Sequence, residues 1–419
     1  MVFQFQEPVR ATPGCQLEPQ RVRISGSESV NRYTWVLPAV NCRAYPELAV
    51  TGLSKTIIRP EYQQLLCGIL ASLKRQQQLS GKTIGEEMAV DNARANEESS
   101  PEPLQLHIDP TYTDINTLKD YPNPFADDNG RLFRPNNALV ITGVPGIGKS
   151  RFLSLIFHLR ILANLPTLFM HEPQSALFYR DGQFGVVNGH LTPTALHTNL
   201  SPDTWCLVDS NNDFQSVPRT LILSGFFIVQ AASPRKDAFN YEKYLRGSAQ
   251  FCVMAPWSAE ELVDGVKLVE RGRENQHLTA EAMRAFHARF GGSAWHAFRY
   301  GHDQVGFYQK VRASTFGLDI QQITRLLASP IEDFPVVDDI AHMLFSVLPT
   351  NDDDRRLFRV APPSNGMLDL ILARCNSDRD EARRILIEIC LGINTASSRL
   401  LAAEIDLPSF ILAGGRRQP

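Results

Sequence analysis

The chain has 419 residues, enough for two or three domains, and its hydrophobic fraction of 43% is ordinary for a globular protein. Its 42 Lys and Arg residues are balanced by 45 Asp and Glu residues, which excludes a general electrostatic attraction to nucleic acid. We find no signal-type leader and no run of about eighteen apolar residues, so we expect an intracellular protein without a membrane span. Seven scattered cysteines without metal-type spacing predict reduced, buried thiols.

Residues 1–137 give few signals of their fold. VNRYTWVLPAV and PELAVTG are typical of strands, and PEYQQLLCGILASLKRQQQ predicts an amphipathic helix with a proline in its first turn. Residues 81–103 are polar, acidic and poor in aromatic side chains, which predicts a linker. We therefore treat residues 1–137 as a region of uncertain fold that contains an acidic linker at 81–103.

Residues 138–256 alternate short apolar runs with helical patterns. The apolar runs are ALVIT, TLFMH, WCLVD, GFFIVQAA and QFCVM. Continuous apolar runs suit strands buried on both faces, and helices between them imply parallel crossovers. We predict an α/β fold of three layers with a mostly parallel sheet, and FYRDGQFGVV predicts an inserted hairpin around Asp181 and Gly182.

Residues 257–419 change to a helical pattern. In PWSAEELVDG, Ser258 lies three residues before Glu261, and this spacing predicts a capping box at the start of a helix. We expect a helical lid followed by a C-terminal helical region that continues to about residue 412.

The segment GVPGIGKS, from Gly143 to Ser150, fits the phosphate-loop pattern G-x-x-x-x-G-K-[ST] between an apolar strand and a long helix. Its glycines allow successive N–H groups to face phosphate oxygens, with Lys149 at the β and γ phosphates and Ser150 on magnesium. The residues expected to bind the nucleotide are Gly143, Val144, Pro145, Gly146, Ile147, Gly148, Lys149, Ser150 and Arg151.

A second motif, WCLVDS, ends a predicted strand in Asp209, which we expect to hold magnesium beside the phosphate loop. Many ATPases carry a glutamate after this aspartate to polarise the attacking water, but here Ser210 follows it. Asp213 and Glu172 are candidates to replace that glutamate, and without a replacement we expect slow hydrolysis.

The next predicted strand leads into QAASPRK, which puts Ser233 at the same edge as a candidate sensor of the γ-phosphate. Arg235 is a candidate to stabilise charge on the phosphates. The guanine signature NKxD is absent, so we expect ATP with Mg2+, and the candidate catalytic residues are Lys149, Asp209, Ser233 and Arg235.

Taken in order, GVPGIGKS, the YRDG hairpin, LVDS, AASPRK and VMAPWSAEELVDG resemble the P-loop ATPase module of Crinkler-type effectors and retrotransposon-hot-spot proteins. The resemblance covers about residues 138–300. It implies an AAA-like or STAND-like ATPase, commonly joined to a nuclease-like domain and associated with DNA or with the nucleus of its own or a host cell. It carries Lys149, Ser150 and Asp209 over as the phosphate, magnesium and Walker-type aspartate positions.

The chain departs from that family in three places. It lacks an LFLAK-type leader, so secretion into a host is not implied. The segment FGGSAWHAF has Ala294 and Trp295 where the family tends to show a proline-arginine pair, which leaves Arg299 as a candidate substitute. After Tyr300 there is no D followed by E-x-K, so we do not expect a nuclease site.

The leading hypothesis is an ATP-driven switch or effector module that contacts DNA or a protein partner. A pseudo-ATPase scaffold is suggested by Ser210, and a small-molecule kinase would have to use Arg180 and Asp181 at an acceptor site. A homo-oligomer would supply an arginine from a neighbouring copy, with Arg219 and Arg246 as candidates.

Overall fold

The computed structural model describes part of the chain, in two compact units. The described residues are 4–5, 20–23, 33–37, 56–86, 123–125, 138–173, 175–181, 183–188, 192–210, 216–233, 249–268, 278–314, 344–350, 355–356 and 358–375. The first unit contains Met1–Val140, Ser150–Ala231 and Tyr241–Gln250, and the second contains Ile141–Lys149, Ala232–Asn240 and Phe251–Pro419. The domain boundaries expected from the sequence, at 137/138 and 256/257, stay a prediction.

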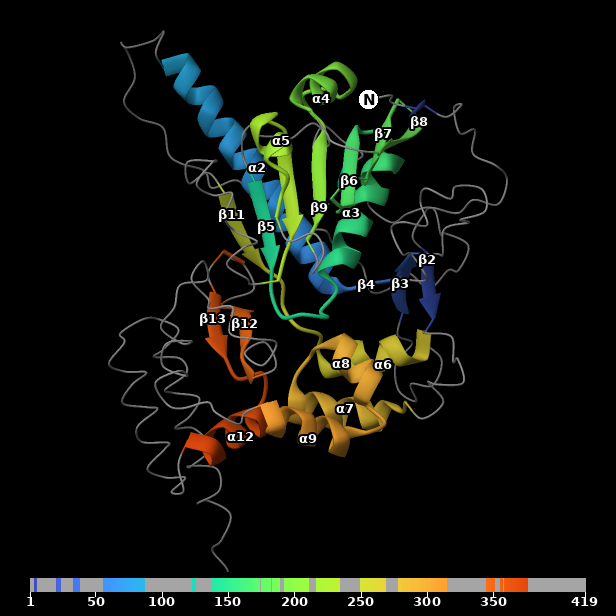
Figure 1. Ribbon diagram of the computed structural model, residues 1–419, viewed down its shortest axis with the longest axis vertical. Coiled ribbons are helices and arrows are strands. Elements are labelled where there is room, and N and C mark those ends of the chain that lie inside the picture. Colours follow the sequence, from blue (N-terminus) through green and yellow to red (C-terminus); the bar gives the residue numbers. More distant parts are fainter. Residues whose placement is uncertain are drawn as a thin grey trace, which may run out of the picture. The chain divides into compact units, whose positions relative to one another are not determined.

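The main sheet has eight strands in the described residues (Figure 1). In spatial order they are β1 (Gln4–Phe5), β8 (Gln183–Asn188), β7 (Ser175–Arg180), β6 (Thr167–Glu172), β9 (Trp205–Asp209), β10 (Phe227–Ala231), β5 (Ala138–Thr142) and β11 (Ala249–Val253). β6, β9 and β10 pair in parallel, whereas β1, β8, β7 and β6 pair antiparallel. The sheet is therefore mixed, with parallel strands in its central part.

The central strands lie where the apolar runs of the sequence predict them. All five residues of β5 and of β10 are buried, as are the first four of β6 and of β9. Strands buried on both faces need continuous apolar sequence, and this requirement made the runs recognisable. The hairpin is also confirmed, because Arg180 of β7 pairs with Gln183 of β8 and Asp181 has a positive φ of 50°.

Two long helices belong to the first unit. α2 (Pro60–Glu86) begins at its proline, as expected, and the ring of Tyr62 lies 5.5 Å from that of Phe152 in α3 (Lys149–Leu162). α2 extends six residues into the segment 81–103, of which residues 87–103 lie outside the described part. The shorter helices are α4 (Pro193–Asn199) and α5 (Arg219–Leu223).

A buried arginine joins the end of α3 to the sheet. Arg160 donates from Nε to Thr167 Oγ1 at 3.0 Å and from its terminal nitrogen to the Pro166 carbonyl at 3.0 Å, and its guanidinium lies 4.4 Å from the ring centre of Trp205. Burial lowers its pKa to about 9, with the charge of Asp203 acting in the opposite direction. The hydrogen bonds and the ring together replace the water that this cation loses.

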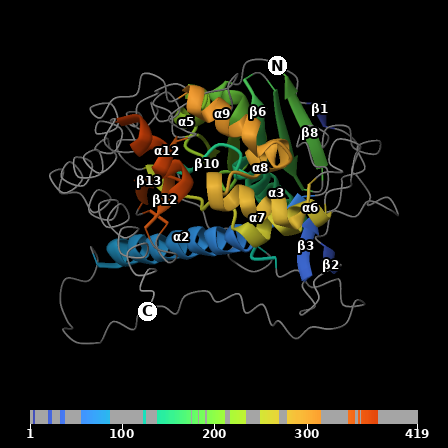
Figure 2. The same ribbon diagram turned by 90° about the horizontal axis from the view of Figure 1, so that it is seen from below.

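The second unit is mainly helical. Its helices are α6 (Ala259–Leu268), α7 (Ala280–Phe290), α8 (Ala294–Tyr300), α9 (Gln304–Ser314) and α12 (Asn365–Cys375). α6 to α9 form one cluster, which is clear in Figure 2. Phe286, Phe290 and Phe307 form its aromatic core, with ring centres 4.9 to 5.4 Å apart.

The capping box at the start of α6 is confirmed in both directions. The Ser258 N–H donates to Glu261 Oε2 at 2.7 Å, and the Glu261 N–H donates to Ser258 Oγ at 3.2 Å. The all-helical expectation for residues 257–419 is incomplete, because β12 (Ser346–Pro349) and β13 (Phe358–Ala361) form an antiparallel pair. Proline, serine and asparagine around these short strands obscured their pattern in the sequence.

The N-terminal region contributes a small sheet of β2 (Gln20–Arg23), β3 (Tyr33–Leu37) and β4 (Thr56–Ile58). β3 confirms the strand expected in VNRYTWVLPAV, whereas PELAVTG lies outside the described residues. Cys206 and Cys252 are buried free thiols, as expected, whereas Cys67 is a free thiol that is only half-buried. Among the described helices, none is both long and apolar enough to cross a membrane.

Candidate functional site: the phosphate loop and the Asp209 edge

The phosphate loop leads from β5 to the first residue of α3, Lys149, as its motif predicts. Gly143, Gly146 and Gly148 have φ angles of 143°, 78° and 103°, a region that L side chains rarely adopt. Glycine at these three positions is therefore required by the backbone.

Close packing adds a second restriction at two of these glycines. A Cβ on Gly143 would lie 2.8 Å from the Met254 carbonyl oxygen, and one on Gly146 would lie 2.6 Å from Trp295 Cβ. Both distances are far below van der Waals contact, so the loop accepts no side chain where the helical segment approaches it.

Five consecutive carbonyl groups of the loop accept hydrogen bonds. The Lys149 ammonium donates to the carbonyls of Gly143 and Val144 at 2.9 and 3.0 Å. Ser293 Oγ donates to Pro145 O at 3.0 Å, the Trp295 N–H donates to Gly146 O at 3.2 Å, and Trp257 Nε1 donates to Ile147 O at 2.8 Å. The last three donors come from the helical segment of the same unit.

These hydrogen bonds fix the direction of the loop's N–H groups. In a trans peptide, the N–H of the following residue points away from the carbonyl. The N–H groups of Gly146, Ile147 and Gly148 therefore point away from the donors in Ser293, Trp295 and Trp257. In phosphate loops generally, successive N–H groups turned to one side form the concave arrangement that binds anions.

In the first unit, Ser150 and Asp209 come together. Ser150 lies in the first turn of α3 and Asp209 is the last residue of β9, and Ser150 Oγ donates to Asp209 Oδ1 at 2.8 Å. A hydroxyl and a carboxylate oxygen at this distance fit Mg2+, which takes oxygen ligands and keeps waters and substrate phosphates in its remaining positions. No cluster of three or more His, Cys, Asp or Glu residues that could hold a metal occurs in the described residues.

The remaining predicted residues are distributed as follows. Arg151 is half-buried on α3, and Ser233 is half-buried two residues after β10. Arg235, Asp213 and Arg246 lie outside the described residues.

Glu172 and the hairpin arginine are held by neighbouring side chains. The side chain of Glu172 is 62% exposed and its Oε1 lies 3.3 Å from His171 Nε2. Arg180 and Asp181, the two residues that a kinase hypothesis would use, form an exposed ion pair of 2.9 Å at the hairpin tip. Ion pairs this exposed contribute little to stability.

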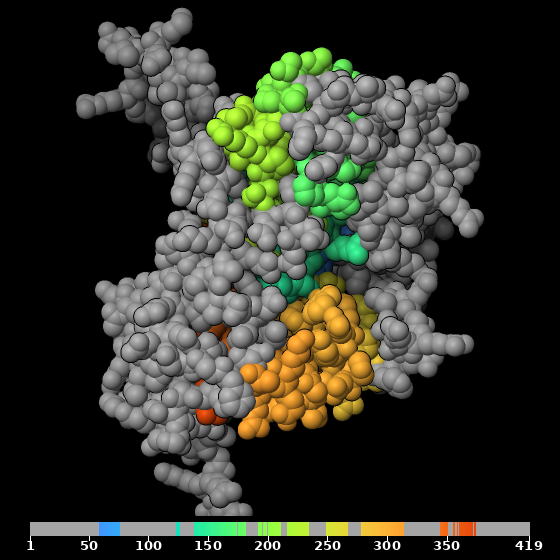
Figure 3. Space-filling view, viewed as in Figure 1, coloured from blue at the N-terminus to red at the C-terminus, as the bar shows by residue number. Residues whose placement is uncertain are grey.

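The segment FGGSAWHAF, with Ala294 and Trp295, contacts the loop through its backbone. Trp295 binds Gly146 O with its N–H, and its side chain is 50% exposed. Arg299 places its guanidinium 5.0 Å from the Trp295 ring centre and 5.4 Å from that of Tyr300. The helices α7 to α9 reach the molecular surface, as Figure 3 shows.

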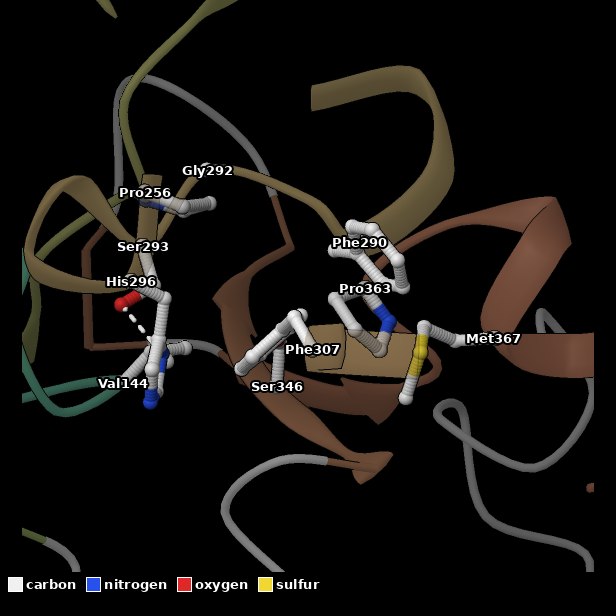
Figure 4. A pocket seen from close by; sticks show the side chains of 10 residues that line it. All are labelled: Val144, Pro256, Phe290, Gly292, Ser293, His296, Phe307, Ser346, Pro363 and Met367. Atoms are coloured by element: carbon white, nitrogen blue, oxygen red, sulfur yellow. Dashed lines mark hydrogen bonds between the residues drawn. The ribbon is translucent and has the colours of Figure 1, made fainter. Parts of the chain in front are cut away.

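His296 forms a hydrogen bond with Ser293 (Figure 4). Its Nδ1 lies 2.9 Å from Ser293 Oγ, and because the hydroxyl proton is donated to Pro145 O, His296 Nδ1–H must be the donor to Ser293. Burial, together with the charges of Lys310 and Arg299, lowers the pKa of His296 to about 4, so the ring is neutral at neutral pH. The cavity beside it measures about 20 Å3, room for one water molecule.

Sequence reasoning missed Trp257, Ser293 and Gln230. Trp257 and Ser293 lie in the segments PWSAEE and FGGSAW, but a pattern of residues does not show that they reach the loop's carbonyls. Gln230 had a signal, since it is a polar residue inside the apolar run GFFIVQAA, and it donates from Nε2 to Ser210 Oγ at 2.6 Å.

Comparison with known proteins gives a partial match. The chain is 33% identical over 138 residues to Crinkler effector protein 15 and to Crinkler effector protein 16 of Phytophthora infestans. The match covers 32% of this chain, and the chain spans 22% of the length of each of these relatives. No family model matches the sequence.

Solved structures give a weaker likeness. The RuvB Holliday junction branch migration motor of Thermotoga maritima is 13% identical with a TM-score of 0.25, over 68% of this chain and 82% of that chain. A point mutant of the same protein is 14% identical with a TM-score of 0.24, over 47% of this chain and 64% of that chain. TM-scores of this size do not establish a shared fold.

Proposed function

We propose that this chain is a P-loop ATPase that binds ATP with Mg2+ and hydrolyses it slowly. In this proposal the core is a three-layer, AAA-like or STAND-like NTPase, and the α6–α9 helices form a lid that responds to the nucleotide. The nucleotide drives a switch or effector module that acts on DNA or on a protein partner.

The observation that carries the proposal is the 2.8 Å contact between Ser150 Oγ and Asp209 Oδ1. Residues 59 positions apart bring together the two oxygen types that a magnesium–phosphate complex uses, directly after a loop with its N–H groups turned to one side.

Each residue has a defined role in this proposal. Lys149 contacts the β and γ phosphates once it leaves the carbonyls of Gly143 and Val144, while Ser150 and Asp209 hold Mg2+, directly or through water. The metal, when bound, neutralises charge on the β and γ phosphates. Ser233 and Arg235 remain proposed contacts of the γ-phosphate.

The biological role rests on the partial likeness to Crinkler effectors. We propose from it an effector-type activity connected with DNA or a nucleus, with ATP turnover setting the switch. Assembly into a homo-oligomer is part of the same proposal, with exposed Arg219 at the start of α5 as a candidate to complete a neighbour's site.

A catalytically weak scaffold is the alternative that one observation favours. The residue after Asp209 is Ser210, which cannot accept a proton from water as a glutamate would. In this alternative the protein binds MgATP tightly and does not turn it over.

Turnover measurements separate these functions. We expect Mg2+-dependent release of phosphate from ATP, reduced at least a hundredfold in Lys149→Ala and in Asp209→Ala. Lys74→Ala, which removes an exposed positive charge from α2, is the matched control and should keep wild-type turnover. Equal turnover in the wild type and both site variants would show a contaminating activity, and binding without turnover would favour the scaffold.

A further inference from the structure

Ser210 and Gln230 form a polar pair immediately after the aspartate of β9. The Ser210 N–H donates to the Ala231 carbonyl at 2.9 Å, which extends the parallel pairing of β9 and β10. Its Oγ accepts a 2.6 Å hydrogen bond from Gln230 Nε2. The pair therefore lies one residue beyond Asp209, which contacts Ser150.

Gln230 is a costly choice at this position. It is 0% exposed in a strand whose other residues are Phe227, Ile228, Val229 and Ala231, and its Oε1 has no hydrogen-bond partner. A buried acceptor without a partner destabilises the fold, whereas an apolar residue of the same shape would avoid that cost. A hydrogen-bond donor that enters beside Asp209 would give Gln230 Oε1 the partner that it lacks.

Ser210 offers the complementary group. Its Oγ already accepts from Gln230, so its own O–H proton remains available for donation, and the residue is half-buried rather than open to bulk solvent. Gln230 Oε1 is closed to bulk solvent, and a water molecule that enters beside it would donate to Oε1 and accept from the Ser210 hydroxyl. Buried waters typically make two to four such hydrogen bonds.

We propose that Ser210 and Gln230 hold the water that attacks the γ-phosphate, as an uncharged substitute for the glutamate that many ATPases have after this aspartate. The inference rests on the proposed function and names the groups that position one of its two substrates. It also replaces Glu172 as a candidate, since that side chain is exposed and lies beside His171, whereas Asp213 lies outside the described residues.

The reaction balances without a protein base. The water oxygen forms a bond to the γ-phosphorus, and the bond from that phosphorus to the β–γ bridging oxygen breaks, with its electron pair leaving on ADP. Because neither an amide nor a serine hydroxyl accepts a proton near neutral pH, the water proton passes to an oxygen of the γ-phosphoryl group, which leaves as phosphate. The pair contributes orientation rather than basicity, so turnover is slow.

The test compares turnover with binding in matched variants. Ser210→Ala and Gln230→Leu are expected to lower kcat for MgATP at least tenfold, while the Kd for a non-hydrolysable ATP analogue stays within twofold. Ser224→Ala, which removes a buried hydroxyl that bonds only to Thr220 O within α5, is the control and keeps kcat. Ser210→Glu, which supplies a base, should have a higher kcat than Ser210→Ala. Its kcat should fall at low pH, where the new glutamate is protonated.

Four outcomes would overturn the inference. Unchanged kcat in Ser210→Ala and Gln230→Leu removes the role, and a parallel loss of analogue binding shows that the pair is only structural. Binding without turnover by the wild type overturns this inference and leaves ATP binding intact, whereas absence of binding overturns the proposed function as well. If Gln230→Leu does not fold, kcat and analogue binding in Ser210→Ala and Gln230→Glu decide whether the pair acts on turnover.

Discussion

Trp257 shows how one residue shapes the loop from outside the motif. Its side chain is 7% exposed, its ring packs edge-on against Phe298 at 5.8 Å, and Nε1 holds the Ile147 carbonyl at 2.8 Å. Because the carbonyl is fixed, the N–H of Gly148 on the same peptide is fixed in the opposite direction. In the proposed function, Trp257 is therefore a positioning residue for the phosphate site.

We expect Trp257→Phe to weaken MgATP binding about fivefold, the loss of roughly 1 kcal/mol from one hydrogen bond. Phenylalanine keeps a ring against Phe298 but has no N–H for Ile147 O. Titration calorimetry with a non-hydrolysable analogue measures the effect.

Trp205→Phe is the matched control for this variant. Trp205 is also buried, and it begins β9, about 13 Å along the strand from Asp209. Both variants lose stability, but only Trp257→Phe should change the affinity. Equal affinities in the two variants would contradict a positioning role for the indole.

At the scale of elements, three helices carry histidines whose pKa is lowered by burial, and of these His158 is fully buried. Burial lowers the pKa of His158 on α3 and of His296 on α8 to about 4, and it also lowers that of His287 on α7. His158 donates from Nδ1 to the Ser154 carbonyl at 2.6 Å, and its buried Nε2 has no partner. Protonation of His158 would place an unpaired charge in a buried core.

These helices should therefore lose stability in acid. The folded-state pKa values lie below the unfolded value of about 6.5, so between pH 6.5 and pH 4 the unfolded chain binds protons that the folded chain excludes. In that window the free energy of unfolding decreases as the pH is lowered, by about 1.4 kcal/mol per pH unit for each such histidine. Urea unfolding at pH 7.0, 6.0 and 5.5 measures the slope, and His158→Gln should flatten it. An unchanged slope in His158→Gln would refute this assignment.

The elements also show where sequence patterns suffice. β5, β6, β9 and β10 were predictable because strands buried on both faces leave unbroken apolar runs, and α6 was predictable because its capping box uses two local residues. β12 and β13 were missed because four-residue strands carry too short a period.

For the molecule as a whole, the two sequence motifs predicted the position of the loop and of Asp209, but not the residues that form hydrogen bonds around them. The spacing G-x-x-x-x-G-K-S reflects local backbone needs, so glycines and Lys149 are readable from sequence. Trp257, Ser293 and Gln230 act through tertiary contacts, which no local pattern encodes. The partial match to Crinkler effectors covers 32% of the chain, so it leaves most of the molecule without a relative by which to assign a role.

The most direct test of the central claim is calorimetric titration of the wild-type protein with ATP, with and without Mg2+, beside Lys149→Ala. We predict saturable binding at one site per chain, tighter with Mg2+ because Ser150 and Asp209 then share the metal with the phosphates. The affinity should fall at least tenfold in Lys149→Ala. Absence of binding, or equal affinity in Lys149→Ala, would contradict the account.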